Sequence, residues 1–366
     1  MNSITGFYLK SSIFLQVGAL FGLLLIMACS SSPVSAEDKP KHHTSDGFCN
    51  YPPGPAPPSF GSLGVGFYFR RIWSAFNLPD VPENHYLPEE KAISQFQQLE
   101  GKNTLTWIGQ STFLIRIDGK IILTDPFFSE YAGAFSIGPR RFAKPGIGIK
   151  HLPPVDIIIV SHNHYDHLDA ESVEVLPNKE NIRVFVPLGL KIFFTKRGYT
   201  HVHELDWNES FSLYNIQMTA LPSVHYSGRG LTDKNKTLWC SWAISSPSGR
   251  YYFVGDTAYS STIFKAIGKK FTSFDLALIT IGTYGNRKYG VNNHTTPEEA
   301  IDLGIDIRTN IFVGMHWGTI EQSDEAPWVP PKRFSEAARK AEISEKRIWI
   351  MKIGETRILP RTHFPK

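Results

Sequence analysis

The most constraining feature of this 366-residue chain is a cluster of histidines and aspartates that directly follows an apolar run. The run 155–160 has the pattern of a strand buried on both faces. After it comes Ser161-His-Asn-His-Tyr-Asp-His-Leu-Asp169. Imidazole nitrogens and carboxylate oxygens are the ligands that zinc-like cations prefer. The segment therefore predicts a metal site on the loop after a strand, rather than a set of solvated histidines.

Three further candidate ligands follow other predicted strands. They are His225, Asp256 and His316. Loops at strand ends collect functional side chains. A lone histidine there is typically structural, and Asp256 lies in a Gly-Asp-Thr sequence that is typical of a turn. Together with the histidine-rich loop, the three residues favour one shared metal site.

The composition places broad limits on fold and partners. With 42% apolar and 13% aromatic residues, the chain can bury a sizeable core in one large domain or two. The formal net charge of +4 is small for this length, and no block of Lys and Arg predicts nucleic-acid binding. At most, this charge favours anionic substrates or lipid headgroups mildly.

The first 28 residues have the pattern of a signal peptide, with one lysine before the apolar run 17–28. This run is too short to span a bilayer comfortably. Its end, Leu25-Ile-Met-Ala-Cys29, resembles the lipobox of bacterial lipoproteins, which implies export and membrane association through a lipidated Cys29 in the cell envelope. Ordinary secretion and a retained anchor are the alternatives. An exported location permits a disulfide between Cys49 and Cys240, although two unrelated thiols are equally consistent with the sequence.

The remaining chain divides by composition into three parts. Residues 29–58 are rich in Pro and Ser, which predicts a poorly packed linker, with His42 and His43 as bystanders. Residues 59–102 are expected to form an N-terminal helical extension. Its aromatic and basic stretch either contacts lipid or packs on the main domain. Residues 103–366 form that main domain.

Strand-like runs come first in the main domain and then alternate with helical segments, and this order repeats in the second half. Two packed sheets with helices on both outer faces accommodate such an order. The predicted strands lie at 104–108, 112–117, 120–124, 155–160, 183–186, 216–220, 239–245, 251–254, 276–281, 311–315 and 348–351. A helix is expected at 88–99, and another begins at Pro297 with Thr295 or Thr296 as its cap.

The order His-x-His-x-Asp-His, a later His, Gly-Asp and a final His resembles the ligand set of the metallo-β-lactamase fold. This resemblance implies an α/β (α+β) architecture, the four-layer αββα sandwich, with two divalent metal ions, for which zinc is the default. Iron and manganese stay open. It implies that the first ion is held by His162, His164 and His225. It implies that the second is held by Asp166, His167 and His316, with Asp256 bridging both and Asp169 orienting a ligand imidazole.

A longer series of motifs resembles the N-acylphosphatidylethanolamine-hydrolysing phospholipase D family over roughly 103–359. The series includes Trp107-Ile-Gly109, Leu123-Thr-Asp-Pro126, Glu204-Leu-Asp-Trp207, Trp239-Cys-Ser-Trp242 and His316-Trp-Gly-Thr319. The resemblance implies a phospholipase D-type phosphodiesterase that releases an N-acylethanolamine and leaves a phosphatidate, through a metal-bridging hydroxide. Gln110 departs from the family, which often has His there. The N-terminal extension also departs, so acyl-chain recognition and a homodimer transfer least.

His294 and Asp166 are the expected catalytic residues. His294 precedes a predicted helix and could bind a phosphoryl oxygen or protonate the leaving alkoxide, with capping or packing as the plainer role. Asp166 is first a ligand and only secondarily a proton carrier. Tyr165 is expected to pack and Trp317 to form a wall of the site. The competing functions are a hydrolase of a lactone or another phosphodiester and a non-catalytic envelope protein with structural metal.

Overall fold

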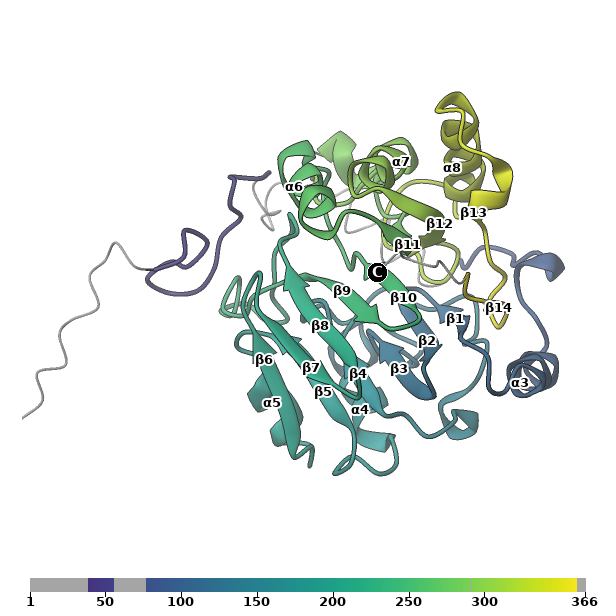
Figure 1. Ribbon diagram of the computed structural model, residues 1–366, viewed down its shortest axis with the longest axis horizontal. Coiled ribbons are helices and arrows are strands. Elements are labelled where there is room, and N and C mark those ends of the chain that lie inside the picture. The colour runs from purple at the N-terminus through teal and green to yellow at the C-terminus, as the bar shows by residue number, and fades with distance from the viewer. Residues whose placement is uncertain (1–38, 56–76, 290, 361–366) are drawn as a thin grey trace, which may run out of the picture. The chain divides into compact units, whose positions relative to one another are not determined.

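A computed structural model describes residues 39–55, 77–289 and 291–360 (Figure 1). The chain groups into two units, residues 1–41 and 42–366, and the second unit holds all helices and strands discussed here. The expected signal peptide, Cys29 and the aromatic stretch before residue 77 lie outside the described residues. Within the described ranges, no helix combines the length and apolar character that a membrane span requires.

Two seven-stranded sheets form the centre of the second unit. In each sheet three antiparallel pairings give way to three parallel pairings. The predicted strands are all members of the sheets, and the strands at 201–205, 210–213 and 356–358 were not among the predicted ones. The first sheet has the order β14 (Thr356–Ile358), β1 (Thr104–Gly109), β2 (Thr112–Ile117), β3 (Lys120–Thr124), β4 (Ile157–Ile159), β5 (Arg183–Pro187), β6 (His201–Leu205). The second has the order β13 (Ile348–Trp349), β12 (Thr309–Met315), β11 (Phe274–Thr280), β10 (Gly249–Phe253), β9 (Ser241–Ser246), β8 (Ile216–Leu221), β7 (Ser210–Leu213).

The largest hydrophobic cluster lies between the two sheets and draws side chains from both, such as Ile115 and Phe185 from the first and Ile244 and Leu278 from the second. A second cluster covers the other face of the first sheet with helices α3 (Glu89–Gln98), α4 (Ala170–Val175) and α5 (Lys191–Thr195). Helices α6 (Ser261–Phe271), α7 (Pro297–Asp306) and α8 (Val329–Lys340) pack together, and α7 contacts β11 and β12 (Figure 1). The predicted αββα sandwich is therefore confirmed.

Local sequence explains how two helices begin. Thr296 caps α7 with a reciprocal capping box to Glu299, and Pro297 occupies the first turn. This confirms the predicted cap. Asp169 caps α4, because its side chain accepts a hydrogen bond from the Glu171 main-chain N–H.

Residues 42–55 differ from the expected linker, because they pack against the main domain. His42 is buried, and its ring stacks on Trp207 with centroids 4.2 Å apart. The Nε2 atoms of His42 and His43 donate to the two carboxylate oxygens of Asp206 at 2.6 and 2.7 Å. These histidines are therefore structural contacts rather than bystanders. Composition alone could not reveal this, since the partners lie more than 160 residues away.

Candidate metal centre

The loops at one edge of the sandwich bring all seven predicted ligands together. The parallel strands of each sheet end at the same edge, so the loops that follow them converge. Four ligands come from the loop after β4, and one each from the loops after β8, β10 and β12. These ligands are His162, His164, Asp166, His167, His225, Asp256 and His316.

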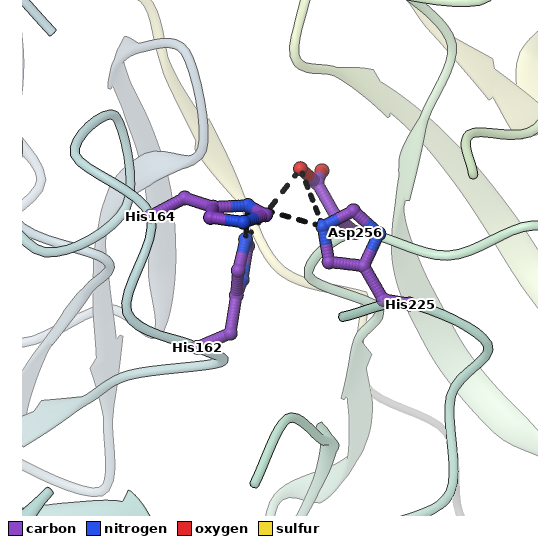
Figure 2. Close-up of side chains that lie close together, drawn as sticks. All are labelled: His162, His164, His225 and Asp256. Atoms are coloured by element: carbon purple, nitrogen blue, oxygen red, sulfur yellow. Dashed lines mark hydrogen bonds and ion pairs between the residues drawn. The ribbon is translucent and has the colours of Figure 1, made fainter. Parts of the chain in front are cut away.

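The first group joins three imidazoles to Asp256 (Figure 2). His164 points its Nδ1 at the Nε2 atoms of His162 and His225, at 2.7 and 3.2 Å. Asp256 Oδ2 lies 3.8 Å from the Nε2 atoms of both His162 and His225. The two sheets thus contribute two side chains each to this group.

The second group joins two imidazoles to two carboxylates. The Nε2 atoms of His167 and His316 lie 3.1 Å apart. Asp166 Oδ2 is 3.3 Å from the first nitrogen and 3.1 Å from the second. Asp256 completes the group, with its Oδ2 3.0 Å from His167 and its Oδ1 3.3 Å from His316. Asp256 is therefore shared by both groups, as the resemblance implied.

The donor sets fit two divalent cations. Two ligand atoms that each lie about 2.0–2.1 Å from a tetrahedral zinc are about 3.3 Å apart. Most separations in the second group are within a few tenths of an ångström of this value. Each group offers nitrogen and carboxylate oxygen donors, which suit zinc and also iron or manganese. The geometry therefore supports a pair of metals, and it leaves their identity to experiment.

Electrostatics makes the first group ready for a cation. Burial lowers the pKa of His164 to about 4. Burial, reinforced by neighbouring imidazoles, also lowers the pKa values of His162 and His225 well below the ordinary range. All three rings are neutral at pH 7, so each keeps a nitrogen lone pair for a metal.

In the second group, the two carboxylates favour the protonated form of both imidazoles. Burial alone would lower the pKa of His316, but Asp256 and Asp166 outweigh burial and raise it to about 9. The same two carboxylates raise the pKa of His167 well above the ordinary range against the effect of burial. A bound cation would supply the positive charge that these two carboxylates otherwise receive from the protonated imidazoles.

Hydrogen bonds to the second ring nitrogens fix the orientation of several ligands. Asp125, fully buried after β3, accepts from His167 Nδ1 at 2.6 Å. His225 Nδ1 donates to the Asn293 carbonyl oxygen at 3.1 Å, and His316 Nδ1 lies 3.1 Å from Thr283 Oγ1. Such contacts select the ring tautomer and direct the other nitrogen to the metal.

The predicted role of Asp169 is wrong in this respect. Its carboxylate accepts from the Ser129 main-chain N–H at 3.1 Å and from Ser129 Oγ at 2.6 Å, in addition to capping α4. Asp125 instead contacts the imidazole of His167. Asp125 lies in Leu123-Thr-Asp-Pro126, directly after a predicted strand, but the resemblance gave the orienting role to Asp169.

Gln110 occupies the position where the resembling family often has histidine, and it contacts the second group. Its Nε2 donates to Asp166 Oδ2 at 3.0 Å and to Gln322 Oε1 at 3.1 Å. The side chain is buried, and it lies on the loop between β1 and β2. An amide here orients the carboxylate without titrating.

A cleft of about 270 Å³ opens beside the two groups. His164, Asp166, Asp256 and His294 are among the side chains that line it. His294 Nε2 lies 3.0 Å from Asp256 Oδ2, and its Nδ1 is buried without a hydrogen-bond partner among the described residues. The predicted catalytic histidine therefore faces the same centre as the ligands.

Tyr165 and Trp317, which were expected to pack and to form a wall of the site, occupy different surroundings. Tyr165 packs against Phe127 and also lines the cleft, and its hydroxyl donates to the Arg229 carbonyl oxygen. Trp317 is a core residue packed on Trp107, with ring centroids 5.3 Å apart.

Among the described residues, one further group with metal-ligand geometry is that of His42, His43 and Asp206. No disulfide joins Cys49 and Cys240, and the latter is a buried thiol.

Comparisons with known proteins agree with the fold and the site. Residues 120–317 match the beta-lactamase superfamily domain. The chain is 37% identical to N-acyl-phosphatidylethanolamine-hydrolyzing phospholipase D 1 of Caenorhabditis elegans, over 62% of this chain and 67% of that protein. It is 35% identical to the mitochondrial N-acyl-phosphatidylethanolamine-hydrolyzing phospholipase D of Saccharomyces cerevisiae, over 69% of this chain and 55% of that protein. The matched part thus spans between about half and two thirds of these relatives.

A solved structure shows the same fold at lower identity. It is a metallo hydrolase from the archaeon Ignicoccus hospitalis, with a TM-score of 0.53 and 18% identity, over 71% of this chain and all of that chain. The fold, the domain match and the sequence similarity agree. The chain belongs to the metallo-β-lactamase superfamily, as a metal-dependent hydrolase similar to the N-acyl-phosphatidylethanolamine-hydrolysing phospholipases D.

Proposed function

We propose that this hydrolase is a phosphodiesterase of phospholipase D type. It hydrolyses N-acylphosphatidylethanolamine-like phospholipids to an N-acylethanolamine and a phosphatidate. The observation that carries the proposal is the pair of four-residue groups that share Asp256 beside a cleft lined by His294. The names of the worm and yeast relatives support the substrate class.

In this proposal the two groups hold two zinc ions, with His162, His164 and His225 in the first, Asp166, His167 and His316 in the second, and Asp256 in both. Bound divalent cations would neutralise phosphoryl charge and lower the pKa of water toward about 7. The neutral rings of the first group and the carboxylates of the second are already in the protonation states that such binding requires. His167 and His316, whose pKa values are raised, would release their protons when a cation binds.

The reaction adds water across one phosphorus–oxygen bond. The water oxygen joins phosphorus, and the bond to the N-acylethanolamine oxygen breaks. His294 is placed for the proton that the leaving oxygen needs, because its Nε2 faces the shared carboxylate of Asp256 at 3.0 Å. The alternative role for the same atom is a hydrogen bond to a phosphoryl oxygen. Asp166 acts first as a ligand.

A lipid substrate would have to lie partly outside the cleft. A volume of about 270 Å³ accommodates a phosphodiester headgroup but not two or three acyl chains. Phe135 is 95% exposed and Ile137 75% exposed on the loop between Ala132 and Pro139, which both line the cleft. Leu231 is fully exposed two residues after Arg229, whose carbonyl accepts from Tyr165 at the cleft. Such apolar side chains suit contact with lipid.

The alternative is a small hydrolysable substrate, such as a lactone or another phosphodiester, and the same cleft volume favours it because the whole molecule would fit. The deciding experiment incubates zinc-loaded protein with N-acylphosphatidylethanolamine and with a lactone, and identifies products by mass spectrometry. Release of N-acylethanolamine that His164→Ala abolishes supports the proposal. His203→Ala, at the far edge of the first sheet, is the control and should retain activity. Turnover of the lactone alone would refute the phospholipase assignment.

Localisation forms a separate proposal. We infer that the protein is exported and anchored in the bacterial cell envelope through a lipidated Cys29, as the lipobox-like sequence suggests. Mass spectrometry of the mature N-terminus tests this, with an acylated cysteine as the expected result and an unmodified or uncleaved terminus as the contrary one. A homodimer is among the least transferable parts of the resemblance, and light scattering of purified protein tests it.

A further inference from the structure

The main chain of His225 is held by a side chain from the beginning of the folded unit. His225 lies on the short loop after β8, outside any strand. Its main-chain N–H donates to Asn50 Oδ1 at 3.1 Å, and its carbonyl oxygen accepts from Asn50 Nδ2 at 2.9 Å. One primary amide thus makes the pair of bonds that a neighbouring strand would make in an antiparallel sheet.

A third hydrogen bond fixes the direction of the Asn50 amide. Its Oδ1 also accepts from the indole Nε1 of Trp239 at 3.1 Å, and that indole is buried. The oxygen therefore faces two donors, and the nitrogen faces an acceptor. Aspartate in place of Asn50 could still accept from the His225 N–H and from Trp239, but it could not donate to the His225 carbonyl oxygen. Alanine could make none of the three hydrogen bonds.

The residues around Asn50 are themselves fastened to the main domain, at Asp206 directly after β6 and at Asn235 between β8 and β9. We call residues 42–55 the N-terminal strap. His42 and His43 hold it to Asp206 through two hydrogen bonds of 2.6 and 2.7 Å. The main-chain N–H of Phe48 donates to the Asn235 carbonyl oxygen at 2.9 Å. Because the strap is fixed at residues before Asn50, the Asn50 main chain is held in place and its amide can contact His225 without ordering a flexible segment first.

Close packing continues after Asn50. A Cβ added at Gly54 would lie 2.5 Å from Val224 Cγ1 and 3.2 Å from Asn50 Nδ2, so the strap lies directly on the residue before His225. On the other side of the loop, the Val224 carbonyl oxygen accepts from the Ala258 main-chain N–H at 2.8 Å. The His225 loop is therefore held between the strap and the segment that follows Asp256.

We propose that Asn50 is a positioning residue of the metal centre, which holds the His225 main chain so that its imidazole meets His162, His164 and Asp256. The inference depends on the proposed role of His225 as a ligand. Among the described residues, the ring makes one hydrogen bond outside its group, from Nδ1 to the Asn293 carbonyl oxygen, and it also contacts the rings of Tyr226 and His294. Asn50 supplies the direct constraint on the His225 main chain, from which the ring projects, because it bonds both the N–H and the carbonyl oxygen of that residue.

Asn50→Ala and Asn50→Asp test the proposal through metal affinity. Loss of a contact that orients a ligand typically weakens metal binding by about 10- to 100-fold. Competition with a chromophoric chelator measures both zinc affinities. In both variants we expect the affinity for one zinc ion to fall about 10- to 100-fold and the affinity for the other to stay unchanged. At limiting zinc kcat should fall with KM unchanged, and excess zinc should restore it.

Asn103→Ala is the matched control. Asn103 Oδ1 also accepts a hydrogen bond from a main-chain N–H, at 3.0 Å. The donor is Asp118, which lies on the turn between β2 and β3. This variant should lower the Tm without changing either zinc affinity. The proposal is overturned if the Asn50 variants lower only the Tm and keep both zinc affinities within twofold of wild type, or if the wild-type protein binds no zinc. Because zinc affinity is the readout, the result does not depend on which lipid the wild-type protein hydrolyses.

Discussion

Asp125→Asn should weaken zinc binding in the second group, although residue 125 is not a ligand. The carboxylate lies in a fully buried position after β3 and accepts three hydrogen bonds. The donors are the Ser161 main-chain N–H at 2.7 Å, Ser161 Oγ at 2.6 Å and His167 Nδ1 at 2.6 Å. Asparagine preserves the shape and one acceptor, but it places an N–H₂ group where two donors now point.

The magnitude follows from the tautomer of His167. The amide nitrogen that Asp125→Asn introduces would face His167 Nδ1 and favour the ring proton on Nε2. That Nε2 is the atom that lies 3.0 Å from Asp256 and 3.1 Å from His316 Nε2, so a proton there competes with the metal. Outer contacts of this kind contribute about 10- to 100-fold to metal affinity. We therefore expect a loss of about 1.4–2.7 kcal/mol in zinc binding.

Chelator competition with the zinc-loaded variant measures this loss, and circular dichroism checks that the fold is intact. Asp169→Asn is the matched control, because Asp169 caps α4 and contacts Ser129. Asparagine keeps the cap, because its Oδ1 can still accept from Glu171, but its N–H₂ replaces the oxygen that accepts from Ser129. We therefore expect this control to lose about 1–3 kcal/mol of unfolding free energy with unchanged zinc affinity. Wild-type zinc affinity in Asp125→Asn, or a larger zinc loss in Asp169→Asn, would refute the reasoning.

Three further results are expected. Burial lowers the pKa of His85 to about 4, below its unfolded value of about 6.5. As the pH falls, the unfolded chain therefore binds this proton before the folded chain does. The unfolding free energy should fall by up to about 3 kcal/mol as the pH is lowered from about 6.5 to about 4. Denaturant titrations should show this fall reduced in His85→Gln, and an unchanged pH profile would contradict it. His294→Gln should lower kcat about 100-fold or more while both zinc ions stay bound, as measured by turnover and metal analysis. Ile137→Ser with Leu231→Ser should lower turnover of lipid in vesicles several-fold but not of a short-chain soluble analogue, whereas Ile192→Ser, 58% exposed on α5, should change neither.

The sequence was informative where function and local pattern coincide. The loop 161–169 predicts metal ligands because metal coordination needs histidines and aspartates at short spacing. Asp256 and His316 could be found because each follows a strongly apolar strand, and the ends of such strands meet at one edge. Their convergence in the structure follows from sheet topology rather than from any contact visible in the sequence.

Long-range contacts were invisible for the opposite reason. The linker-like composition of residues 42–55 gives no sign that His42 and His43 meet Asp206, or that Asn50 meets His225. Asp169 and Asp125 are both aspartates beside the metal loop, and only the three-dimensional arrangement shows which one reaches an imidazole. Helix α8 was missed because its buried stripe is narrow and consists of Pro330, Phe334, Ala337 and Ala338.

The sharing of Asp256 between the two groups has a consequence for biosynthesis. The loop after β4 emerges from the ribosome with His162, His164, Asp166 and His167, but the shared carboxylate follows about 90 residues later and His316 about 60 residues after that. A nascent chain that has made only strands β1 to β6 of the first sheet therefore has no closed cage for either cation. Loading is expected to be a late event, coupled to the docking of one half of the sandwich onto the other. Cations bound there would then act as cross-links between the halves, and their removal should loosen the interface between the sheets before it affects either sheet alone.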